Sequence, residues 1–219
     1  MIQRKQRIPM RDLSTMTAED REAVEKNAMN GRIFNIFKVL AHHPKLVKRW
    51  TPFAGHILGK QTLPFRDREL LILRIGWLNQ AEYEFAQHEL IAKRGGVSDA
   101  DVERLKEGPM AKGWTPEEAA LLQVADDLYE NSVVSDATWA ALSKKYSTEQ
   151  LMDMVVLIGR YWTVSVVLNT CDRIAVLDFG RKIAEGTPEE IQQLQRPSPS
   201  TVVPETPQQT PPPAETPKQ

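Results

Sequence analysis

The stretch AEYEFAQH, residues 81–88, gathers side chains that can carry acid–base chemistry. It holds the carboxylates Glu82 and Glu84, the phenol Tyr83 and the imidazole His88. On a helix, residues four apart share a face, so Glu84 and His88 can point at one spot, while Glu82 lies on another line. A carboxylate one turn before a histidine can orient the ring or share a proton with a substrate. The same spacing also fits an ordinary exposed pair on a helix surface.

A third carboxylate, Glu69, lies on the preceding predicted helix, twelve residues before Ala81. Its helical neighbours are apolar or small, namely Ile72, Leu73 and Gly76. If this line faces the interior, desolvation makes Glu69 a useful acid or base. If it faces water, Glu69 only complements the positive end of the helix. Three nearby arginines can pair with it or bind an anionic substrate: Arg66, Arg68 and Arg74.

Other chemistries find little support. Glu84 and His88 could supply two metal ligands, but no second Glu-x-x-x-His pair is present, and we expect no metal. The chain has no Gly-x-Ser-x-Gly nucleophile motif and no Gly-rich phosphate loop, and we expect no cofactor. The single cysteine, Cys171, cannot form an intrachain disulfide, which fits a reducing compartment.

Composition favours a soluble, cytoplasmic protein. The 219 residues are 41% hydrophobic, enough for one domain with an appendage, and the formal net charge is -1. This balance gives no reason to expect nucleic acid or an anionic membrane as partner. The most apolar segment, residues 151–168, contains Asp153 and Arg160, which would be costly in a bilayer, so we interpret it as a buried core helix.

The elements that must position these residues are predicted to be helices throughout residues 1–170. Apolar residues recur at helical spacing in 33–42, in 44–53 and after Pro64, and Gly95-Gly96 can end the helix that holds AEYEFAQH. Five helix starts carry capping residues: Thr17, Ser98, Thr115, Ser135 and Ser147. No alternating strand pattern precedes residue 170.

The character of the chain changes after Thr170. Residues 171–195 are predicted to form a strand, a turn at Phe179-Gly180-Arg181, a second strand and a short helix starting at Thr187-Pro188. Residues 196–219 are rich in Pro, Thr and Gln with almost nothing to bury, so we predict a disordered tail.

The order RDRELLILRIGWLNQAEYEFAQHELIAKRGGVSDADVERL, residues 66–105, resembles the central helical pair of the carboxymuconolactone decarboxylase family, within the alkylhydroperoxidase D-like superfamily. The similarity extends from about Asn30, through AHHP at 41–44, to about Thr170. It implies an all-α fold, assembly into trimers or hexamers, and a small-molecule site near a subunit interface. The predicted division is therefore 1–170 as this helical domain, 171–195 as the appendage and 196–219 as the tail.

The resemblance also implies residue roles. In the peroxidase branch a glutamate precedes a Cys-x-x-Cys pair and a histidine follows it; here Glu69 and His88 match, but Ala81 and Glu84 occupy the cysteine positions. Dithiol chemistry therefore cannot run, which argues against a peroxidase. The decarboxylase branch implies a lyase acting on a small unsaturated lactone or carboxylic acid. We expect His88, oriented by Glu84, to donate the proton, with Glu69 steering it.

Tyr83 and Arg74 are the weaker candidates, for binding the substrate carboxylate or lactone oxygen. A related isomerisation or hydration would use the same residues. A second resemblance joins CDRIAVLDFGRKIAEGTPEEIQ, residues 171–192, to the C-terminal end of ABC transporter ATPase subunits, without any of their nucleotide-binding motifs. This leaves a third hypothesis, a non-catalytic oligomeric binding protein whose appendage contacts a partner.

Overall fold

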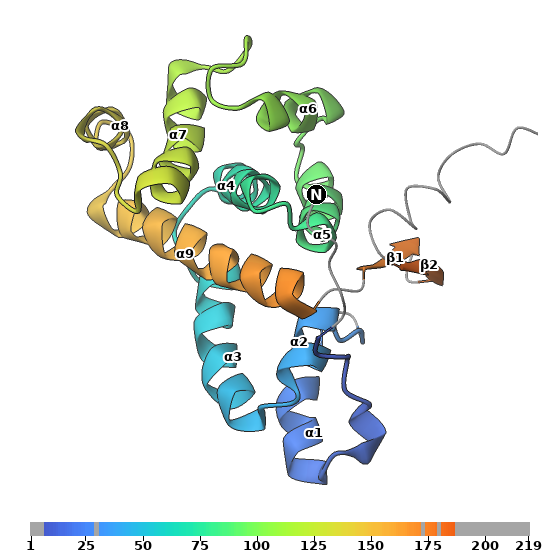
Figure 1. The fold of residues 1–219 in the computed structure, drawn as a ribbon. Coiled ribbons are helices and arrows are strands. Elements are labelled where there is room, and N and C mark those ends of the chain that lie inside the picture. Colours follow the sequence, from blue (N-terminus) through green and yellow to red (C-terminus); the bar gives the residue numbers. More distant parts are fainter. Residues whose placement is uncertain (1–6, 29–30, 172–173, 179–180, 187–219) are drawn as a thin grey trace, which may run out of the picture.

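The structure is a computed structural model, and it describes residues 7–28, 31–171, 174–178 and 181–186 (Figure 1). A short 3-10 helix, η1 (Leu13–Thr15), comes first. The α-helices that follow are α1 (Ala18–Glu25), α2 (Asn35–Leu40), α3 (Pro44–Gly59), α4 (Phe65–Leu78), α5 (Glu82–Arg94), α6 (Asp99–Glu107), α7 (Pro116–Asn131), α8 (Asp136–Leu142) and α9 (Thr148–Cys171). The all-α class predicted for this part of the chain is confirmed. The boundaries differ in detail, because α2 begins two residues late and α3 continues through Pro52 to Gly59.

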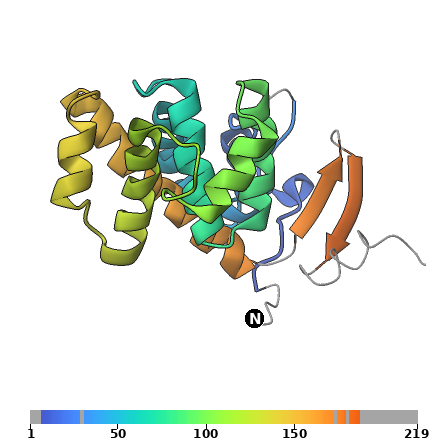
Figure 2. The same cartoon turned by 90° about the horizontal axis from the view of Figure 1, so that it is seen from above.

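The centre of the main core is α4. Nine of its fourteen residues are buried, and Leu70, Leu71, Leu73 and Ile75 have no exposed surface. In Figure 1, α5, α6 and α7 surround α4 on one side, and α9 crosses below it. Seen from above, α8 lies at the opposite end of this group from α5 (Figure 2). A helix segment buried on all sides must be apolar on every face, and this is why residues 70–76 of α4 contain only apolar residues and Gly76 apart from Arg74.

A second, smaller core joins the N-terminal helices. Val24 of α1, Phe37 and Leu40 of α2, and Val47 of α3 pack together with Ala41. Figure 1 shows this group on the other side of α9 from α4–α8. The long helix α9 therefore packs against both cores, and it contacts α2 and α3 as well as α4.

The predicted capping residues occupy their helix starts. Ser98 and Thr115 form complete capping boxes with Asp101 and Glu118, the third residues of α6 and α7. The side chains of Thr17, Ser135 and Ser147 accept bonds from the amides of Asp20, Thr138 and Gln150, respectively. At the other end of α5, the amides of Gly96 and Val97 bond the carbonyls of Lys93 and Ala92, the pattern that ends a helix at a residue of positive φ, here Gly96.

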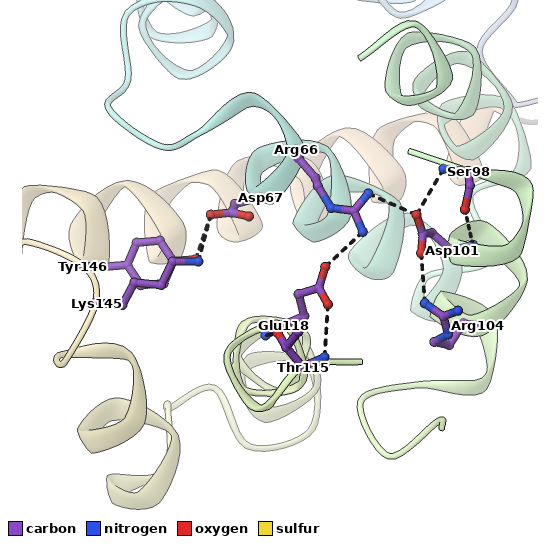
Figure 3. A network of polar contacts seen from close by, with 9 residues as sticks. All are labelled: Arg66, Asp67, Ser98, Asp101, Arg104, Thr115, Glu118, Lys145 and Tyr146. Carbon is purple, nitrogen blue, oxygen red and sulfur yellow. Dashed lines mark hydrogen bonds and ion pairs between the residues drawn. The ribbon is translucent and has the colours of Figure 1, made fainter. Parts of the chain in front are cut away.

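One arginine ties the two capping boxes to α4 (Figure 3). Arg66 donates to Asp101 at 3.1 Å and to Glu118 at 2.9 Å. Burial alone would raise the pKa of the Asp101 carboxyl, but the bonds from Arg66 and from the Ser98 amide lower it to about 2. On the same helix Asp67 accepts a 2.7 Å bond from the Tyr146 hydroxyl. The start of α4 is thus attached to α6, α7 and the segment before α9.

Among the described residues, one helix is long and apolar enough to cross a membrane by length and composition, the Thr148–Thr170 part of α9. Core helices pass the same test. Asp153 of α9 accepts bonds from the amide and hydroxyl of Thr62, and Arg160 lies at a cavity described below. These contacts agree with the interpretation of α9 as a core helix.

Two strands follow α9: β1 (Ile174–Asp178) pairs antiparallel with β2 (Arg181–Gly186), with an irregularity between Val176 and Leu177. The two predicted strands of the appendage are therefore present, with Arg181 in β2, whereas Phe179 and Gly180 of the predicted turn lie outside the described residues. The short helix of the appendage and the 196–219 tail also lie outside the described residues. The division into three parts stays a prediction.

Candidate functional site

The short connection between α4 and α5 places the helix that carries Glu69 beside the helix that carries Glu84 and His88. Three residues link them, and Gln80 adopts a positive φ of 53° so that the chain can reverse. The Ala81 amide bonds the Gly76 carbonyl at 2.9 Å. Because Gly76 has no side chain, α5 approaches closely, and a Cβ at Gly76 would lie 3.4 Å from Oε1 of Glu84.

Glu69 and His88 meet in the interior. Oε2 of Glu69 lies 2.8 Å from Nδ1 of His88, and Glu69 has no exposed surface. The other carboxylate oxygen accepts from Nε and Nη2 of Arg68 at 2.9 and 2.8 Å. A carboxylate only accepts hydrogen bonds, so Nδ1 of His88 carries the proton in this contact. The ring is fixed by Glu69, and its second nitrogen, Nε2, is left for a substrate.

Tyr161 of α9 supports the histidine from the side. Its ring meets the His88 ring edge-on at a centroid distance of 4.9 Å. Burial raises the pKa of the Tyr161 phenol above its ordinary value, while the Arg160 guanidinium beside it opposes that rise. Tyr161 is therefore a neutral wall of the site in the pH range where proteins work, and it limits how the imidazole can tilt.

Glu84 is buried with only 3% of its surface exposed. Its Oε1 accepts a 3.2 Å bond from the Ser165 hydroxyl, and its Oε2 is buried with no hydrogen-bond partner in the described part of the chain. Burial raises the pKa of Glu84 to about 8, against the smaller lowering effects of the Ser165 bond and the charge of Arg160. At neutral pH the carboxyl is mostly protonated and can donate a proton or a hydrogen bond.

Glu84 and His88 line one cavity of about 100 Å³. The cavity lies among the start of α2, the end of α3, one face of α5 and the second half of α9. Its lining is mainly apolar and comprises Phe34, Ile36, Phe37, Leu58, Tyr83, Glu84, Gln87, His88, Ile91, Arg160, Tyr161, Val164 and Leu168. Apolar walls with a few polar groups are typical of a small-molecule site.

The predicted residues are arranged partly as expected. Glu84 and His88 do face one space, and Glu82 is exposed. However, the structure has no hydrogen bond between Glu84 and His88; Glu69 orients the ring instead, from behind the cavity and not from its lining. Glu84 bonds Ser165 because its side chain points across to α9. Its expected role as the orienting carboxylate is therefore corrected.

Tyr83 lines the cavity as expected of a substrate-binding residue. The Asn35 amide donates a 3.3 Å bond to its hydroxyl oxygen, which connects α5 to the first turn of α2. Burial raises the pKa of the Tyr83 phenol, and the bond from Asn35 opposes the change. The phenol therefore keeps its proton at neutral pH and can donate it in a hydrogen bond.

Arg74 is not part of the cavity lining. Its guanidinium pairs with both oxygens of Asp126 on α7, at 2.7 and 2.8 Å. It also donates to the carbonyls of Leu105 and Lys106, the last residues but two and one of α6. A buried cation at a helix C-terminus is a structural contact that satisfies free carbonyls. This placement does not support the substrate-binding role predicted for Arg74.

Arg160 is the cavity residue that the sequence reasoning missed. It is 7% exposed, and its guanidinium lies 4.7 Å from the ring centroid of Tyr161 and 5.7 Å from that of Trp50. The signal in the sequence is a positive charge inside the apolar segment 151–168, which argues against a membrane span but does not by itself indicate a binding site. Ser165, five residues on, carried no signal of its own.

The described residues contain no group of three or more His, Cys, Asp or Glu side chains placed to hold a metal ion. The site is therefore a set of acid–base groups around an apolar cavity. The fold that holds this site is all-α and is similar to that of a solved alkylhydroperoxidase AhpD core.

Residues 44–127 match the model of the carboxymuconolactone decarboxylase family. This segment contains α4 and α5 with Glu69, Glu84 and His88, whereas Arg160 and Ser165 lie beyond it. A search of curated proteins finds no match.

Solved structures share the fold at low identity. The alkylhydroperoxidase AhpD core of a peroxidase-related protein from Ralstonia eutropha JMP134 superposes with a TM-score of 0.65 at 20% identity, over 75% of this chain and 88% of that one. A peroxidase-related protein from Silicibacter sp. TM1040 gives 0.62 at 18% identity, over 76% and 91%. Protein ATU0492 from Agrobacterium tumefaciens gives 0.54 at 19% identity, over 58% and 88%. These likenesses concern the fold alone.

Proposed function

We propose that the protein is an acid–base lyase of the carboxymuconolactone decarboxylase type, acting on a small unsaturated lactone or carboxylic acid. The observation that carries the proposal is the buried Glu69–His88 contact of 2.8 Å behind a cavity that Glu84 also lines. A histidine held by a carboxylate on one nitrogen and open to a substrate on the other is an arrangement for proton transfer.

The reaction makes modest demands on the site. When the C–C bond to the carboxylate breaks, CO2 leaves and the bonding electron pair passes into the conjugated lactone as a dienolate. A carbon of that dienolate must then accept a proton. Doubly protonated His88 delivers this proton from Nε2, and the carboxylate of Glu69 stabilises the imidazolium that precedes the transfer.

Glu84 plays a different part from the one its spacing suggested. With its pKa raised to about 8 by burial, it is a neutral acid at pH 7. Its unpartnered Oε2 can donate a hydrogen bond to the lactone oxygen, on which negative charge develops. Tyr83 is a second neutral donor on the same helix. An isomerisation or hydration would use the same groups.

Peroxide reduction by a cysteine pair is disfavoured by the residues present. Ala81 and Glu84 stand where the peroxidase branch has its cysteines, and the only cysteine of the chain is Cys171. Peroxide consumption that disappears in Cys171→Ser would be needed to support that chemistry here.

The test of the proposal is turnover. Purified protein is mixed with 4-carboxymuconolactone and a panel of related unsaturated lactone acids while CO2 release is followed. We expect turnover of at least one compound, and a loss of about 10²- to 10⁴-fold in His88→Asn. Absence of turnover on the whole panel would contradict the proposed lyase activity. Equal rates for the wild type and His88→Asn would contradict the proposed proton transfer by His88.

A further inference from the structure

Arg160 is a buried cation without an ionic partner. Its Nε and Nη1 atoms are buried and make no hydrogen bond within the described residues, and none of the ion pairs among these residues includes it. The other arginine buried in the main helical core, Arg74, has both a carboxylate and two carbonyls as partners. A guanidinium with two idle donors is therefore exceptional in this molecule and calls for a ligand.

The surroundings of Arg160 hold its plane but leave its Nε and Nη1 atoms without a hydrogen-bond partner within the described residues. The rings of Tyr161 and Trp50 lie near the guanidinium, at centroid distances of 4.7 and 5.7 Å. Such contacts stabilise the cation by its flat faces and do not occupy the N–H groups in the plane. The in-plane donors of an arginine match the two oxygens of a carboxylate.

The nearest carboxyl group does not fill this role. Glu84 lines the same cavity and senses the charge of Arg160, but no hydrogen bond or ion pair joins them. Burial keeps Glu84 mostly protonated at neutral pH, so it does not neutralise the arginine. The cavity lining therefore presents the guanidinium of Arg160 beside the neutral acid Glu84, with the imidazole of His88 and the polar side chains of Tyr83 and Gln87 on mainly apolar walls.

We propose that Arg160 anchors a carboxylate of the substrate, so that the cavity selects small, flat organic acids that place one carboxylate near Tyr161 and Trp50. This deepens the function proposed above, because it names the group that holds the acid while His88 and Glu84 face its unsaturated part. A cavity of about 100 Å³ has space for a molecule of about one ring.

The charge of the cavity also predicts how binding depends on pH. The titratable and charged groups around it are Glu84, His88 and Tyr83 from α5, Arg160 and Tyr161 from α9, and Glu69 with Arg68 from α4 behind the histidine. Arg32, before α2, lies beside the Tyr83 hydroxyl, whereas the lining residues of α2 and α3 are apolar. When Glu84 loses its proton, its negative charge competes with the ligand for Arg160. Anion binding is therefore strongest below pH 8 and falls as the pH rises through that value.

The experiment measures equilibrium binding of benzoate to the full chain by calorimetry, with benzamide as the neutral ligand of the same shape. We expect benzoate to bind at least tenfold more tightly than benzamide. Arg160→Met should abolish this preference, and Arg160→Lys should reduce it, because a lysine cannot form the two-point contact. Glu84→Gln should keep the preference for benzoate and lose its decline above pH 8.

Three results would overturn the proposal: no benzoate binding by the wild type at millimolar concentration, equal binding of benzoate and benzamide, or unchanged benzoate binding in Arg160→Met. We expect Arg160→Met to melt at the same or a higher temperature than the wild type, since it removes an unpaired buried charge. If it fails to fold, the ratio of benzoate to benzamide affinity in Arg160→Lys decides.

The outcome is separable from the fate of the proposed lyase. His88→Asn should lose turnover while still binding benzoate more tightly than benzamide. Selective benzoate binding without turnover of any lactone acid would support the carboxylate-binding role of Arg160 and contradict the proposed lyase activity. Turnover with no role for Arg160 in binding would support the lyase activity and contradict the role of Arg160.

Discussion

At the scale of single residues, the site depends on the different roles of two glutamates, Glu69 and Glu84, toward His88 and the cavity. Glu69, fully buried and bonded to Arg68, holds Nδ1 of His88. Glu84, bonded only by Ser165, is kept neutral by burial. Two glutamates thus have different charges because their partners differ, one facing a guanidinium at 2.8 Å and the other a hydroxyl at 3.2 Å.

Replacing Glu69 by glutamine tests the orienting role. The amide can still accept from Nδ1 but carries no negative charge, so the imidazolium loses its counter-charge. We expect kcat to fall by about 10²-fold or more with a small change in KM. The exposed Glu130→Gln serves as the matched control and should keep wild-type kcat. A Glu69→Gln enzyme with wild-type kcat would contradict the proposed role of Glu69 in holding and stabilising protonated His88.

The raised pKa of Glu84 has a consequence for stability. In the unfolded chain this carboxyl loses its proton near pH 4.5, whereas in the folded chain it keeps the proton until about pH 8. The folded state binds the extra proton between these values, so the free energy of unfolding falls as the pH rises through this window. Above pH 8 the contribution of Glu84 is constant.

Glu84→Gln removes this dependence. Relative to the wild type, the variant should gain roughly 3 to 4 kcal/mol of stability between pH 5 and pH 8, because the slope is about 1.4 kcal/mol per pH unit and flattens near each pKa. Urea unfolding of both proteins at the two pH values measures the difference. A constant difference would mean that Glu84 titrates near its ordinary value.

Sequence periodicity predicted part of this site. Glu84 and His88 share a face because they are four residues apart, and the apolar line through Glu69 indicated burial. Arg160 and Ser165 could not be placed, since they reach Glu84 only by the packing of α9 against α5, more than seventy residues further along the chain. The partner of Arg74 was unpredictable for the same reason, because Asp126 lies on α7.

At the scale of elements, helix starts were the best-predicted features, because a capping residue acts within four positions of itself. Thr17, Ser98, Thr115, Ser135 and Ser147 all cap as expected. How the capped helices join could not be predicted locally. The structure joins α6 and α7 through Arg66 of α4, whose two branches reach the capping carboxylates of both helices (Figure 3).

Arg66→Met should therefore loosen two helix starts at once. We expect a loss of about 1 to 2 kcal/mol in the free energy of unfolding, because the pairs are only partly buried. The exposed Arg94→Met on α5 is the control. The loss should shrink at pH 2, where Asp101 is half protonated. Equal stabilities of the two variants at pH 7 would contradict a stabilising role for the Arg66 contacts with Asp101 and Glu118.

At the scale of the whole molecule, α9 leaves an apolar stripe uncovered on the side away from α4. Met152 is 62% exposed, Val155 37%, Val156 39% and Val166 51%. These positions recur at helical spacing along one face. An uncovered apolar helix face supports the proposed homo-oligomer.

Val156→Lys puts a charge in the middle of this stripe. We expect the wild type to run as a trimer or hexamer in light scattering and the variant to run as a smaller species. Val133→Lys, at a 62% exposed position outside α9, should leave the assembly intact. A monomeric wild type would show that the stripe has no such role.

The main claim is that His88, held by Glu69, transfers a proton to carbon. It is tested most directly by running the reaction in D2O and following deuterium in the product by mass spectrometry. We predict one solvent deuterium per turnover with the wild type, and initial incorporation slower by about 10²- to 10⁴-fold in His88→Asn. Incorporation at equal rates by the two proteins would contradict this account.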